Sequence, residues 1–212
     1  MPLYITQIKG ARIKAQFRKI CKAHLQAGCK KVNFEDKKTI ALLKQELIAR
    51  NAKSVLLYCP MAMEVNVYPL IAWLRQRTKI RVFIPHIDGV SFKMIPFRLP
   101  LYQNKYHIFE ARKSLFYLTK IDTAVVPVLG MDKKFKRIGF GKGMYDRFFQ
   151  ALPYRPNVIF ISRRMIVSKR IITDDYDIFG DKFISSFCVI KRGIDDRILS
   201  NRIYNIWFRR GD

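Results

Sequence analysis

The stretch Ser54-Val55-Leu56-Leu57-Tyr58-Cys59-Pro60 decides the fold class. Its apolar run is continuous rather than alternating, and a proline ends it. Such a run predicts a strand that is buried on both faces, which is typical of parallel sheets. The pattern of strand and proline recurs at 81–85 and 123–127, and 157–162 is a further apolar run. The sequence therefore predicts a parallel sheet built from these segments.

Helical patterns separate the predicted strands. Apolar residues recur at three- and four-residue steps over 10–27 and 36–50, and 65–77 is a further helix with Pro69 in its first turn. The predicted apolar faces consist of Phe17, Ile20, Cys21 and Leu25 in the first helix and of Ile40, Leu43, Leu47 and Ile48 in the second. This alternation predicts an α/β fold, a single domain over residues 1–212. We expect a mostly parallel sheet with helices on both faces, an open, Rossmann-like architecture of three layers.

Two segments depart from the alternation of strands and helices. Residues 89–107 predict an antiparallel excursion or a long loop, and residues 193–212 carry the pattern of an additional C-terminal helix. In open parallel sheets, ligands bind beyond the carboxyl ends of the strands. The residues that follow Cys59, Ile84 and Val126 are therefore the first place to look for a site.

The chain is strongly basic. Of its 212 residues, 41 are Lys or Arg and 16 are Asp or Glu, which gives a formal net charge of +25. A surface of this kind attracts anions, among them nucleic acids, membrane headgroups, nucleotides and polycarboxylates. Hydrophobic residues make up 50% of the chain, so the sequence predicts a folded core rather than a disordered polymer.

Cysteine usage and hydropathy bear on metal content and compartment. The 4 cysteines form no C-x-x-C pair and the chain has only 3 histidines, which argues against a zinc site of the usual spacing. No apolar stretch approaches the roughly 20 residues of a membrane span, and no signal-peptide pattern opens the chain. We therefore expect a cytoplasmic protein with free thiols and no membrane partner.

The strongest local motif is Arg137-Ile138-Gly139-Phe140-Gly141-Lys142-Gly143-Met144-Tyr145-Asp146-Arg147. Glycines at alternate positions let backbone N–H groups converge on one point, with Lys142 among them. This combination predicts a phosphate cradle, and Asp146 is placed to ligate Mg²⁺ on the phosphates. The spacing fits neither the P-loop nor the dinucleotide fingerprint. The alternatives are a glycine-rich turn with a surface lysine and, at Asp146, a helix-start acid.

Together with residues 126–132, this motif resembles the signature of the 5-formyltetrahydrofolate cyclo-ligase family. That signature is a V-P-G-L-x-F-D lead followed by R-L-G-x-G-x-G-Y-Y-D-R. Both aspartates, the arginine and all three loop glycines are present here. Gly130-Met131 stands where the family has a small residue and Phe, and Met144 replaces the first tyrosine of the family's pair. Because that tyrosine helps to enclose the folate, the resemblance implies an altered folate affinity rather than lost chemistry.

Lys14 and Arg18 match a K-x-x-x-R that reaches the ATP phosphates in the family. On a helical wheel Lys14 falls within the apolar stripe of the first predicted helix, and Arg18 falls at its edge. A charge on a buried stripe is costly unless it is paired, which makes a bound anion a suitable partner. The alternative is a lysine whose stem packs while its ammonium reaches water.

Further residues match the family on its folate and metal sides. Glu64 corresponds to a residue that contacts the folate, and Cys59 to one that packs against it; the alternatives are a helix-start acid and a packed thiol. Asp177 corresponds to an acid that joins Asp146 in holding magnesium, with Asp181 closing the same D-x-x-x-D; the alternative is a solvated acidic turn. In the folate-approach segment 102–110, Tyr106 and Glu110 are weak matches to which we assign no role.

The resemblance implies an ATP- and Mg²⁺-dependent cyclisation of 5-formyltetrahydrofolate to 5,10-methenyltetrahydrofolate, with release of ADP and phosphate. The implied catalytic residues are Lys142 and Arg137. The implied ATP-binding residues are Lys14, Arg18, Arg137, Gly139, Phe140, Gly141, Lys142, Gly143, Met144 and Tyr145. The implied substrate-binding residues are Cys59, Glu64, Phe140 and Met144, and the metal ligands are Asp146 and Asp177. We expect a monomer or weak dimer that acts on ATP and a polyglutamylated or simple folate.

Two other classes of function remain open from the sequence. A nucleic-acid-binding module is compatible with the +25 charge, but no RNP-like or GXXG motif occurs and the basic residues are spread along the chain. A family member that binds folate or nucleotide without turnover is compatible with Met144. Salt-dependent RNA binding would support the first alternative, and ATP binding without turnover would support the second.

Overall fold

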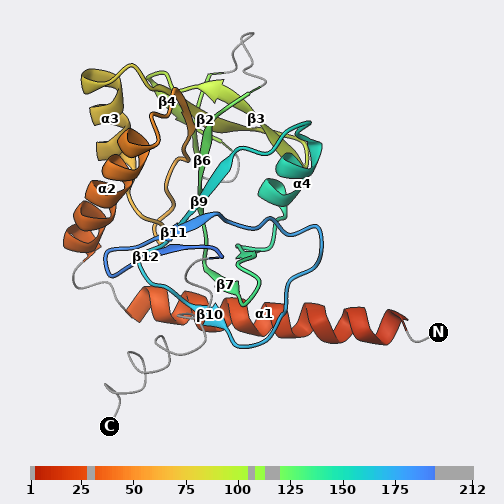
Figure 1. Ribbon diagram of the computed structural model, residues 1–212. Coiled ribbons are helices and arrows are strands. Elements are labelled where there is room, and N and C mark those ends of the chain that lie inside the picture. The colour runs from red at the N-terminus through yellow and green to blue at the C-terminus, as the bar shows by residue number, and fades with distance from the viewer. Residues whose placement is uncertain (1–2, 28–31, 105–107, 113–119, 194–212) are drawn as a thin grey trace.

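The computed structural model describes residues 3–27, 32–104, 108–112 and 120–193, with side chains from residue 12 onward (Figure 1). Its centre is a seven-stranded sheet with the order β12-β11-β9-β6-β1-β2-β3. These strands are β1 (Ser54–Leu56), β2 (Arg81–Asp88), β3 (Ser91–Pro96), β6 (Thr123–Pro127), β9 (Asn157–Ile161), β11 (Lys182–Ile184) and β12 (Val189–Lys191). All four strands predicted from apolar runs are therefore confirmed.

The inner strands of the sheet are parallel, and both edge strands are antiparallel. Val55 of β1 lies opposite Val82 of β2 on one side and Thr123 of β6 on the other, both in parallel register. The pairs β6–β9 and β9–β11 are also parallel, whereas β3 and β12 pair antiparallel to their neighbours. Because the inner strands run the same way, their carboxyl ends meet at one edge, as the continuous apolar runs predict.

Helices cover both faces of the sheet. They are α1 (Leu3–Ala27), α2 (Val32–Ala49), α3 (Tyr68–Arg77) and α4 (Met144–Ala151). Val55 and Leu57 pack with α2 and α3 on one face, while Leu56 packs with the aromatic residues around α4 on the other. The predicted α/β architecture is confirmed. The helix predicted over 65–77 begins later, at Tyr68, and Pro69 lies in its first turn.

The predicted antiparallel excursion is also confirmed. Residues 91–96 return along β2, and β4 (Leu101–Gln103) pairs antiparallel with β5 (Phe109–Ala111). A third sheet of order β10-β7-β8 contains β7 (Gly130–Asp132), β8 (Arg137–Ile138) and β10 (Val167–Ser168). The β7–β8 hairpin leads from the end of β6 into the glycine motif, which places that motif beyond the carboxyl edge of the main sheet.

Asp132 fastens the turn of the β7–β8 hairpin. Its side chain is fully buried, and Oδ1 accepts hydrogen bonds from the backbone N–H groups of Lys134 (3.0 Å) and Lys136 (3.3 Å). Oδ2 accepts hydrogen bonds from the N–H groups of Ile172 (3.3 Å) and Thr173 (3.2 Å) and from the Thr173 hydroxyl. Asp132 therefore joins the hairpin to the segment after β10, which explains an aspartate at this point of the motif.

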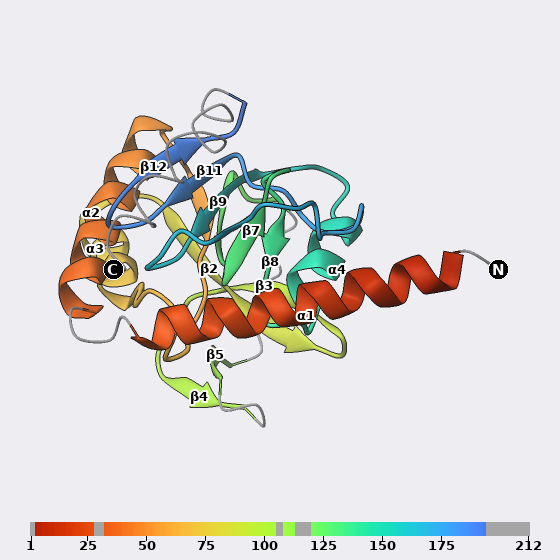
Figure 2. The same cartoon turned by 90° about the horizontal axis from the view of Figure 1, so that it is seen from below.

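Helix α1 runs across the carboxyl edge of the sheet rather than along a face (Figures 1 and 2). Cys21 and Leu25 pack against Leu129, which follows β6. A Cβ at Gly130 would lie only 3.0 Å from Cys21 Sγ and 2.7 Å from a backbone oxygen, so a larger residue here would push α1 away. Glycine at this position thus permits the close approach of the helix.

Two residues assigned to apolar helix faces were placed wrongly. Ile20 of α1 is 51% exposed and Ile48 of α2 is 57% exposed. Each helix buries a stripe narrower than the periodicity suggests, because the described part of α1 packs through Phe17, Cys21 and Leu25 and α2 packs through Ile40, Leu43 and Leu47. Sequence periodicity alone does not set the width of a buried stripe.

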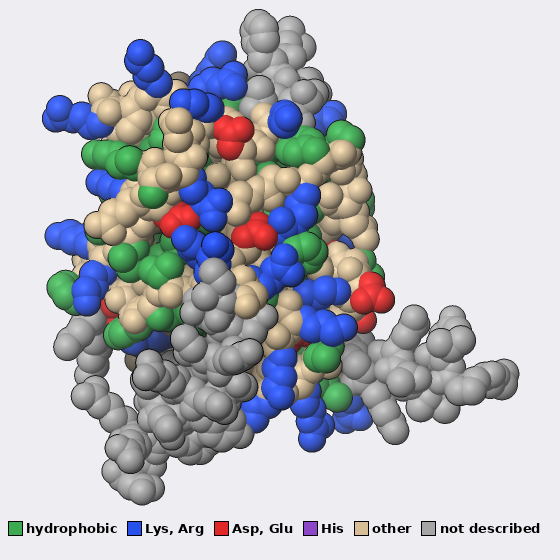
Figure 3. Space-filling model, in the orientation of Figure 1, with side chains coloured by type: hydrophobic (Ala, Val, Ile, Leu, Met, Phe, Trp, Pro, Cys, Tyr) green, Lys and Arg blue, Asp and Glu red, His purple; other side chains and the backbone are tan. Residues whose placement is uncertain are grey.

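Lys and Arg side chains are distributed over the whole face seen in Figure 3, between apolar groups and a few acids. In the described part of the chain, no helix has the length and apolar character needed to cross a membrane. The helix predicted over 193–212 lies outside the described residues apart from Gly193, as do Cys29 and Tyr106.

Candidate functional site

Four segments that are far apart in the sequence meet at the carboxyl edge of the sheet. They are α1, the glycine loop 139–143, the start of α4 and residues 174–178. Lys14 of α1 is ion-paired with Asp177, and its Nζ lies 3.2 Å from Asp174 Oδ2. Lys14 and Asp177 are both buried, at 6% exposure each. The sequence placed both residues in one site, and the structure brings their side chains into contact.

Arg18 connects α1 to the glycine loop. Its Nε donates a hydrogen bond to the carbonyl oxygen of Gly139 (3.1 Å). A Cβ at Gly141 would lie 3.5 Å from the Arg18 guanidinium carbon, which is van der Waals distance. The Lys22 ammonium lies 5.5 Å from the centre of the Phe140 ring. Two basic residues of α1, Arg18 and Lys22, therefore lie against the glycine loop.

Each glycine of the loop has a separate structural reason. A Cβ at Gly139 would lie 2.3 Å from Arg137 Nη2, so glycine is required for the Arg137 side chain to fold over this residue. Gly141 has φ +102° and Gly143 has φ +64°, backbone conformations that L side chains rarely adopt. Gly143 precedes α4, so the loop delivers its backbone to the N-terminal end of a helix, where anions are stabilised.

Arg147 and Lys142 behave differently within the motif. The Arg147 guanidinium donates hydrogen bonds to the carbonyl oxygens of Lys142 (2.5 Å) and Val90 (2.7 Å), which ties the loop to the β2–β3 turn. The Lys142 side chain is exposed, and its ammonium has no partner among the described residues. A fixed loop with an unpaired lysine at its tip is suited to an anionic ligand.

Asp146 and Asp177 lie beside each other. The backbone N–H of Ile178 donates a hydrogen bond to Asp146 Oδ1 (3.4 Å), and Arg137 Nη1 lies 3.7 Å from Asp146 Oδ2. Carboxylate oxygens are the ligands that Mg²⁺ prefers, so the two predicted metal ligands fit that ion chemically. Across the described residues, no group of three or more His, Cys, Asp or Glu side chains is arranged for a metal ion. A metal held here would therefore need further ligands from a phosphate or water.

Glu64 is a buried carboxyl group in the loop between β1 and α3. Its Oε2 accepts a hydrogen bond from the N–H of Met61 (2.8 Å). Burial raises the pKa of Glu64 to about 7, although this hydrogen bond and the charges of Arg137 and Arg163 lower it. A buried carboxyl group with a raised pKa, in a loop that follows a parallel strand, is typical of functional sites.

Cys59 and Tyr145 contribute packing surface. Burial raises the pKa of the Cys59 thiol to about 11, so the thiol is protonated at neutral pH and is not an activated nucleophile. Burial also raises the pKa of Tyr145 well above its ordinary value. The Tyr145 ring lies 4.8 Å from the Arg137 guanidinium carbon and meets Phe92 edge to face at 5.0 Å. Met144 and Phe140 are half-buried: Met144 packs in the cluster that contains Phe92 and Tyr145, whereas Phe140 packs against Cys21, Leu25 and Leu129 of another cluster.

Residues that the sequence did not single out also belong to the site. Asp174 is the second acid at Lys14, and Tyr176 donates a hydrogen bond to its carboxylate (2.7 Å). The acidic run 174–177 was the available signal, but only one of its members was selected. Arg163, which follows β9, contacts the loop that carries Glu64. Asp181, by contrast, lies at the other end of β9, where its Oδ2 accepts a hydrogen bond from the N–H of Val158 (2.8 Å).

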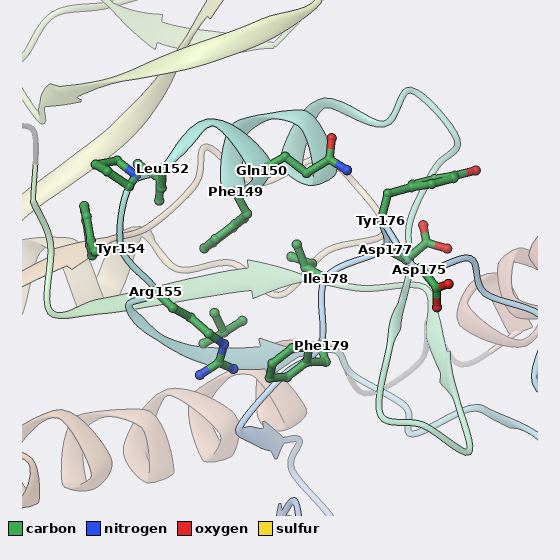
Figure 4. A pocket seen from close by; sticks show the side chains of 12 residues that line it. Phe149, Gln150, Leu152, Tyr154, Arg155, Asp175, Tyr176, Asp177, Ile178 and Phe179 are labelled. Carbon is green, nitrogen blue, oxygen red and sulfur yellow. The ribbon is translucent and has the colours of Figure 1, made fainter.

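A pocket of about 390 Å³ opens beside Asp177, between the end of α4 and residues 175–179 (Figure 4). Aromatic side chains line much of it, and Leu152 and Tyr154 lie at the end opposite Asp175 (Figure 4). Its lining residues are Phe149, Gln150, Leu152, Pro153, Tyr154, Arg155, Val158, Asp175, Tyr176, Asp177, Ile178 and Phe179. The pocket shares Asp177 with the ionic site but does not include Lys14, Arg18 or Lys142.

The fold and the site define an α/β protein with a glycine-rich loop and charged side chains gathered at the carboxyl edge of its sheet. Comparison with known sequences specifies the class further, because a sequence model of the 5-formyltetrahydrofolate cyclo-ligase family matches residues 11–177. The chain belongs to the 5-formyltetrahydrofolate cyclo-ligase family. The matched span includes Lys14, the glycine loop, Asp146 and Asp177, all residues that carried the resemblance in sequence.

Solved structures share the fold. The chain is similar to 5,10-methenyltetrahydrofolate synthetase of Aquifex aeolicus, with a TM-score of 0.69 and 23% identity over 84% of this chain and 92% of that one. It is also similar to the synthetase of Mycoplasma pneumoniae, with a TM-score of 0.63 and 23% identity over 82% of this chain and 98% of that one. These similarities confirm the mostly parallel sheet with helices on both faces.

A curated relative is similar in sequence over part of its length. The 5-formyltetrahydrofolate cyclo-ligase of Haemophilus influenzae is 29% identical over 109 residues, which span 48% of this chain and 58% of that protein. Somewhat more than half of the relative is therefore matched.

Proposed function

We propose that this protein is an ATP-dependent 5-formyltetrahydrofolate cyclo-ligase, which forms 5,10-methenyltetrahydrofolate and releases ADP and phosphate. One observation carries the proposal: within the span matched by the family, Lys14 and Arg18 converge with the glycine loop and with Asp146 and Asp177. This site combines cations, backbone N–H groups and carboxylates at the edge of the sheet where such folds bind ligands.

The chemistry needs positioning and charge neutralisation more than a protein nucleophile. The formyl oxygen attacks the γ-phosphorus of ATP, and ADP leaves. N10 of the folate then attacks the activated formyl carbon, the ring closes, and phosphate leaves. Lys142 is free to reach the transferred phosphoryl group, and Arg137 is held over Tyr145 beside the loop. Stabilisation of phosphate charge by such groups is the main contribution of a protein to phosphoryl transfer.

In this proposal the nucleotide is held by residues of α1 and by the backbone of the glycine loop. Lys14, Arg18 and the N–H groups of residues 139–145 bind the phosphates, while Asp146 and Asp177 hold Mg²⁺. In the structure these two acids face Arg137 and Lys14. Binding of a nucleotide and Mg²⁺ would exchange partners, so that the cations turn to phosphates and the acids to the metal. Mg²⁺ would supply neutralisation of the phosphate charge.

The folate side of the site is formed by Glu64, Cys59, Phe140 and Met144. The buried carboxylate of Glu64 is an acceptor for donor groups of the folate, and the packed thiol of Cys59 supplies apolar surface. Met144 offers a flexible apolar side chain where the family has tyrosine. We infer weaker folate binding from this replacement, since a phenolic hydrogen-bonding group is absent. The described cysteines are free thiols, which supports a cytoplasmic location.

The test is the absorbance of methenyltetrahydrofolate after the protein is mixed with 5-formyltetrahydrofolate, ATP and Mg²⁺. We expect an ATP-dependent rise that falls by roughly a hundredfold or more in rate in Lys142→Ala and Asp146→Ala. Lys133→Ala is the matched control, because Lys133 is also exposed but lies outside the loop. A flat trace from folded protein that still binds ATP would reject the activity and favour a binding protein. Salt-dependent RNA binding without ATP binding would favour the nucleic-acid alternative.

A further inference from the structure

Arg163 is a buried arginine that joins three separate parts of the chain. It lies two residues after the last residue of β9 and is 7% exposed. Its Nε and Nη2 donate hydrogen bonds to the two carboxylate oxygens of Asp36 in α2, at 2.8 and 3.0 Å. Its Nη1 donates a hydrogen bond to the carbonyl oxygen of Ala62 (2.9 Å), between β1 and α3. This bidentate geometry is specific to arginine, since lysine cannot reproduce it.

Asp36 completes the connection from the opposite side. Its Oδ2 accepts a hydrogen bond from the backbone N–H of Asn66 (3.0 Å) in addition to the contact with Arg163. The loop from 61 to 66 is thus held at Ala62 by Arg163 and at Asn66 by Asp36. Glu64 lies between these two attachment points. The loop contains no strand or helix. Its other hydrogen bonds include a turn, in which the N–H of Glu64 donates to the carbonyl oxygen of Met61 (2.9 Å), and a contact from the Tyr58 hydroxyl to the carbonyl oxygen of Val65 (2.9 Å). Asp36 and Arg163 therefore supply the attachment of the loop to α2 and to the segment after β9.

A buried ion pair is an expensive way to stabilise a fold. Two well-packed apolar residues in its place are often neutral or stabilising, so such a pair is weak evidence for a role in stability alone. Beyond their contact with each other, Asp36 and Arg163 both form hydrogen bonds with the backbone of one loop, residues 61–66. That loop carries the carboxyl group with which we propose the folate is bound.

We propose that Asp36 and Arg163 are positioning residues that fix the Glu64 loop for recognition of the folate. The proposal rests on the role of Glu64 in the proposed function. Neither residue acts on the substrate itself. Arg163 has a second, electrostatic effect, because its positive charge lowers the pKa of Glu64 against the effect of burial. The attachment of the loop fixes the position of the Glu64 carboxyl group, and the charge of Arg163 favours its ionised form.

The chain contains a matched control for this arrangement. Glu35 and Arg164, one residue before Asp36 and one after Arg163, form a second ion pair between the same two segments (2.8 Å). Arg164 also lies over the ring of Phe187 (4.8 Å). The contacts of this second pair do not include the 61–66 loop. It therefore reproduces the link between α2 and β9 without the attachment of the loop.

The experiment compares Arg163→Lys and Asp36→Asn with Arg164→Lys and Glu35→Gln in the full chain. We expect Arg163→Lys and Asp36→Asn to raise the KM for 5-formyltetrahydrofolate roughly tenfold, as loss of hydrogen bonds to charged groups predicts. The KM for ATP should change less than about twofold, because the phosphate site makes none of these contacts. Arg164→Lys and Glu35→Gln should leave both KM values near those of the wild type.

A second readout does not depend on activity. Amide hydrogen exchange over residues 61–66 should become faster in Arg163→Lys and Asp36→Asn and stay unchanged in the two control variants. If the wild type is inactive, the proposed function is refuted. If exchange over 61–66 is then still faster in Arg163→Lys and Asp36→Asn than in the wild type, restraint of the loop is supported. Equal exchange and equal KM values in Arg163→Lys and Arg164→Lys would overturn the inference. If Arg163→Lys does not fold, Asp36→Asn decides the question, since it keeps the volume of the side chain.

Discussion

The ammonium of Lys14 is ion-paired with the carboxylate of Asp177, 163 residues later in the chain, and both side chains are buried. Asp177 Oδ2 also accepts a hydrogen bond from the N–H of Asp174 (2.7 Å). The two residues were predicted to bind opposite partners, phosphate and magnesium. Without those ligands they neutralise each other, which lets α1 dock on the sheet edge with a lysine in its apolar stripe.

The first prediction concerns the stability of this pair. Lys14→Met alone should destabilise the protein by about 3 kcal/mol, because the buried carboxylate of Asp177 loses its ionic partner. Asp177→Asn alone should destabilise it by less, because Lys14 keeps Asp174 at 3.2 Å. The double variant should be less destabilised than the sum of the two single variants. Urea denaturation of the four proteins measures this coupling.

An exposed ion pair serves as the control for that cycle. Lys93 and Asp88 form an ion pair at 2.7 Å, with side chains 51% and 54% exposed. Their coupling should be at most about 0.5 kcal/mol. Equal coupling in the exposed and the buried pair would contradict the role assigned to burial.

The second prediction concerns Gly139. Gly139→Ala places a methyl group in the space of the Arg137 guanidinium, so we expect a loss of about 1–3 kcal/mol in unfolding free energy. Arg137 must then leave its position over Tyr145, and ATP-dependent turnover should fall as well. In an Arg137→Ala background the same substitution should cost little, because the clashing side chain is gone. An additive double variant would show that Gly139 is needed for another reason.

The third prediction follows from the raised pKa of Glu64, about 7 against an ordinary value of 4.5. The folded protein binds this proton more tightly than the unfolded chain does. Its contribution to stability is therefore complete below about pH 4.5 and is lost as the pH rises through 7. Glu64→Gln should stabilise the protein more at pH 8 than at pH 5, by about 2 kcal/mol, while weakening folate binding.

Glu46 provides a control of opposite sign for the titration of Glu64. Burial raises the pKa of Glu46, but the hydrogen bonds and positive charges of Lys182 and Arg50 lower it by a larger amount, so the net shift is downward. Its contribution to stability is present above the ordinary carboxyl pKa and is lost as the pH falls. Glu46→Gln should therefore destabilise the protein at pH 8 more than at pH 4. Thermal unfolding curves at several pH values distinguish the two carboxyl groups.

The fourth prediction concerns magnesium. ATP with Mg²⁺ at about one hundred times its dissociation constant should stabilise the protein by about 2.7 kcal/mol. Removal of Mg²⁺ with a chelator should reduce this gain, because the phosphates then face Asp146 and Asp177 without a cation between them. Asp146→Asn should abolish the difference made by Mg²⁺. Asp175→Asn, at an exposed acid in the same segment, should retain it; loss in both variants would indicate a diffuse charge effect.

The strands and the sheet were predictable because buried parallel strands leave an unmistakable pattern. The runs at 55–60 and 124–127 are apolar at every position, and so short an apolar run that ends in proline is typical of a strand buried on both faces. The glycine loop was predictable for a similar reason, since its spacing is rare. The exposed positions of Ile20 and Ile48 were not, because they depend on which surface each helix meets.

The partners of the charged residues could not be predicted from the sequence. Lys14 and Asp177 were each singled out, but nothing local indicates that they pair. Asp36 lies between Glu35 and Lys37 in the sequence, and Arg163 precedes Arg164. Charged residues beside other charged residues are very common on protein surfaces, so neither one stands out. Long-range pairs of this kind depend on the folded topology, which places the end of β9 against α2 and the start of the chain against residues 174–178.

The long separation between Lys14 and Asp177 has a consequence for biosynthesis. Asp177 is the 163rd residue added after Lys14. At 5–20 residues per second, a ribosome needs roughly 8 to 33 s to add them. During that time α1 has an apolar stripe with an unpaired lysine, and docking it would bury an uncompensated charge. Helix α1 is therefore expected to dock only after the sheet and residues 174–177 have formed. Nascent chains that stop before residue 177 should expose α1 to protease, and those that continue past it should protect it.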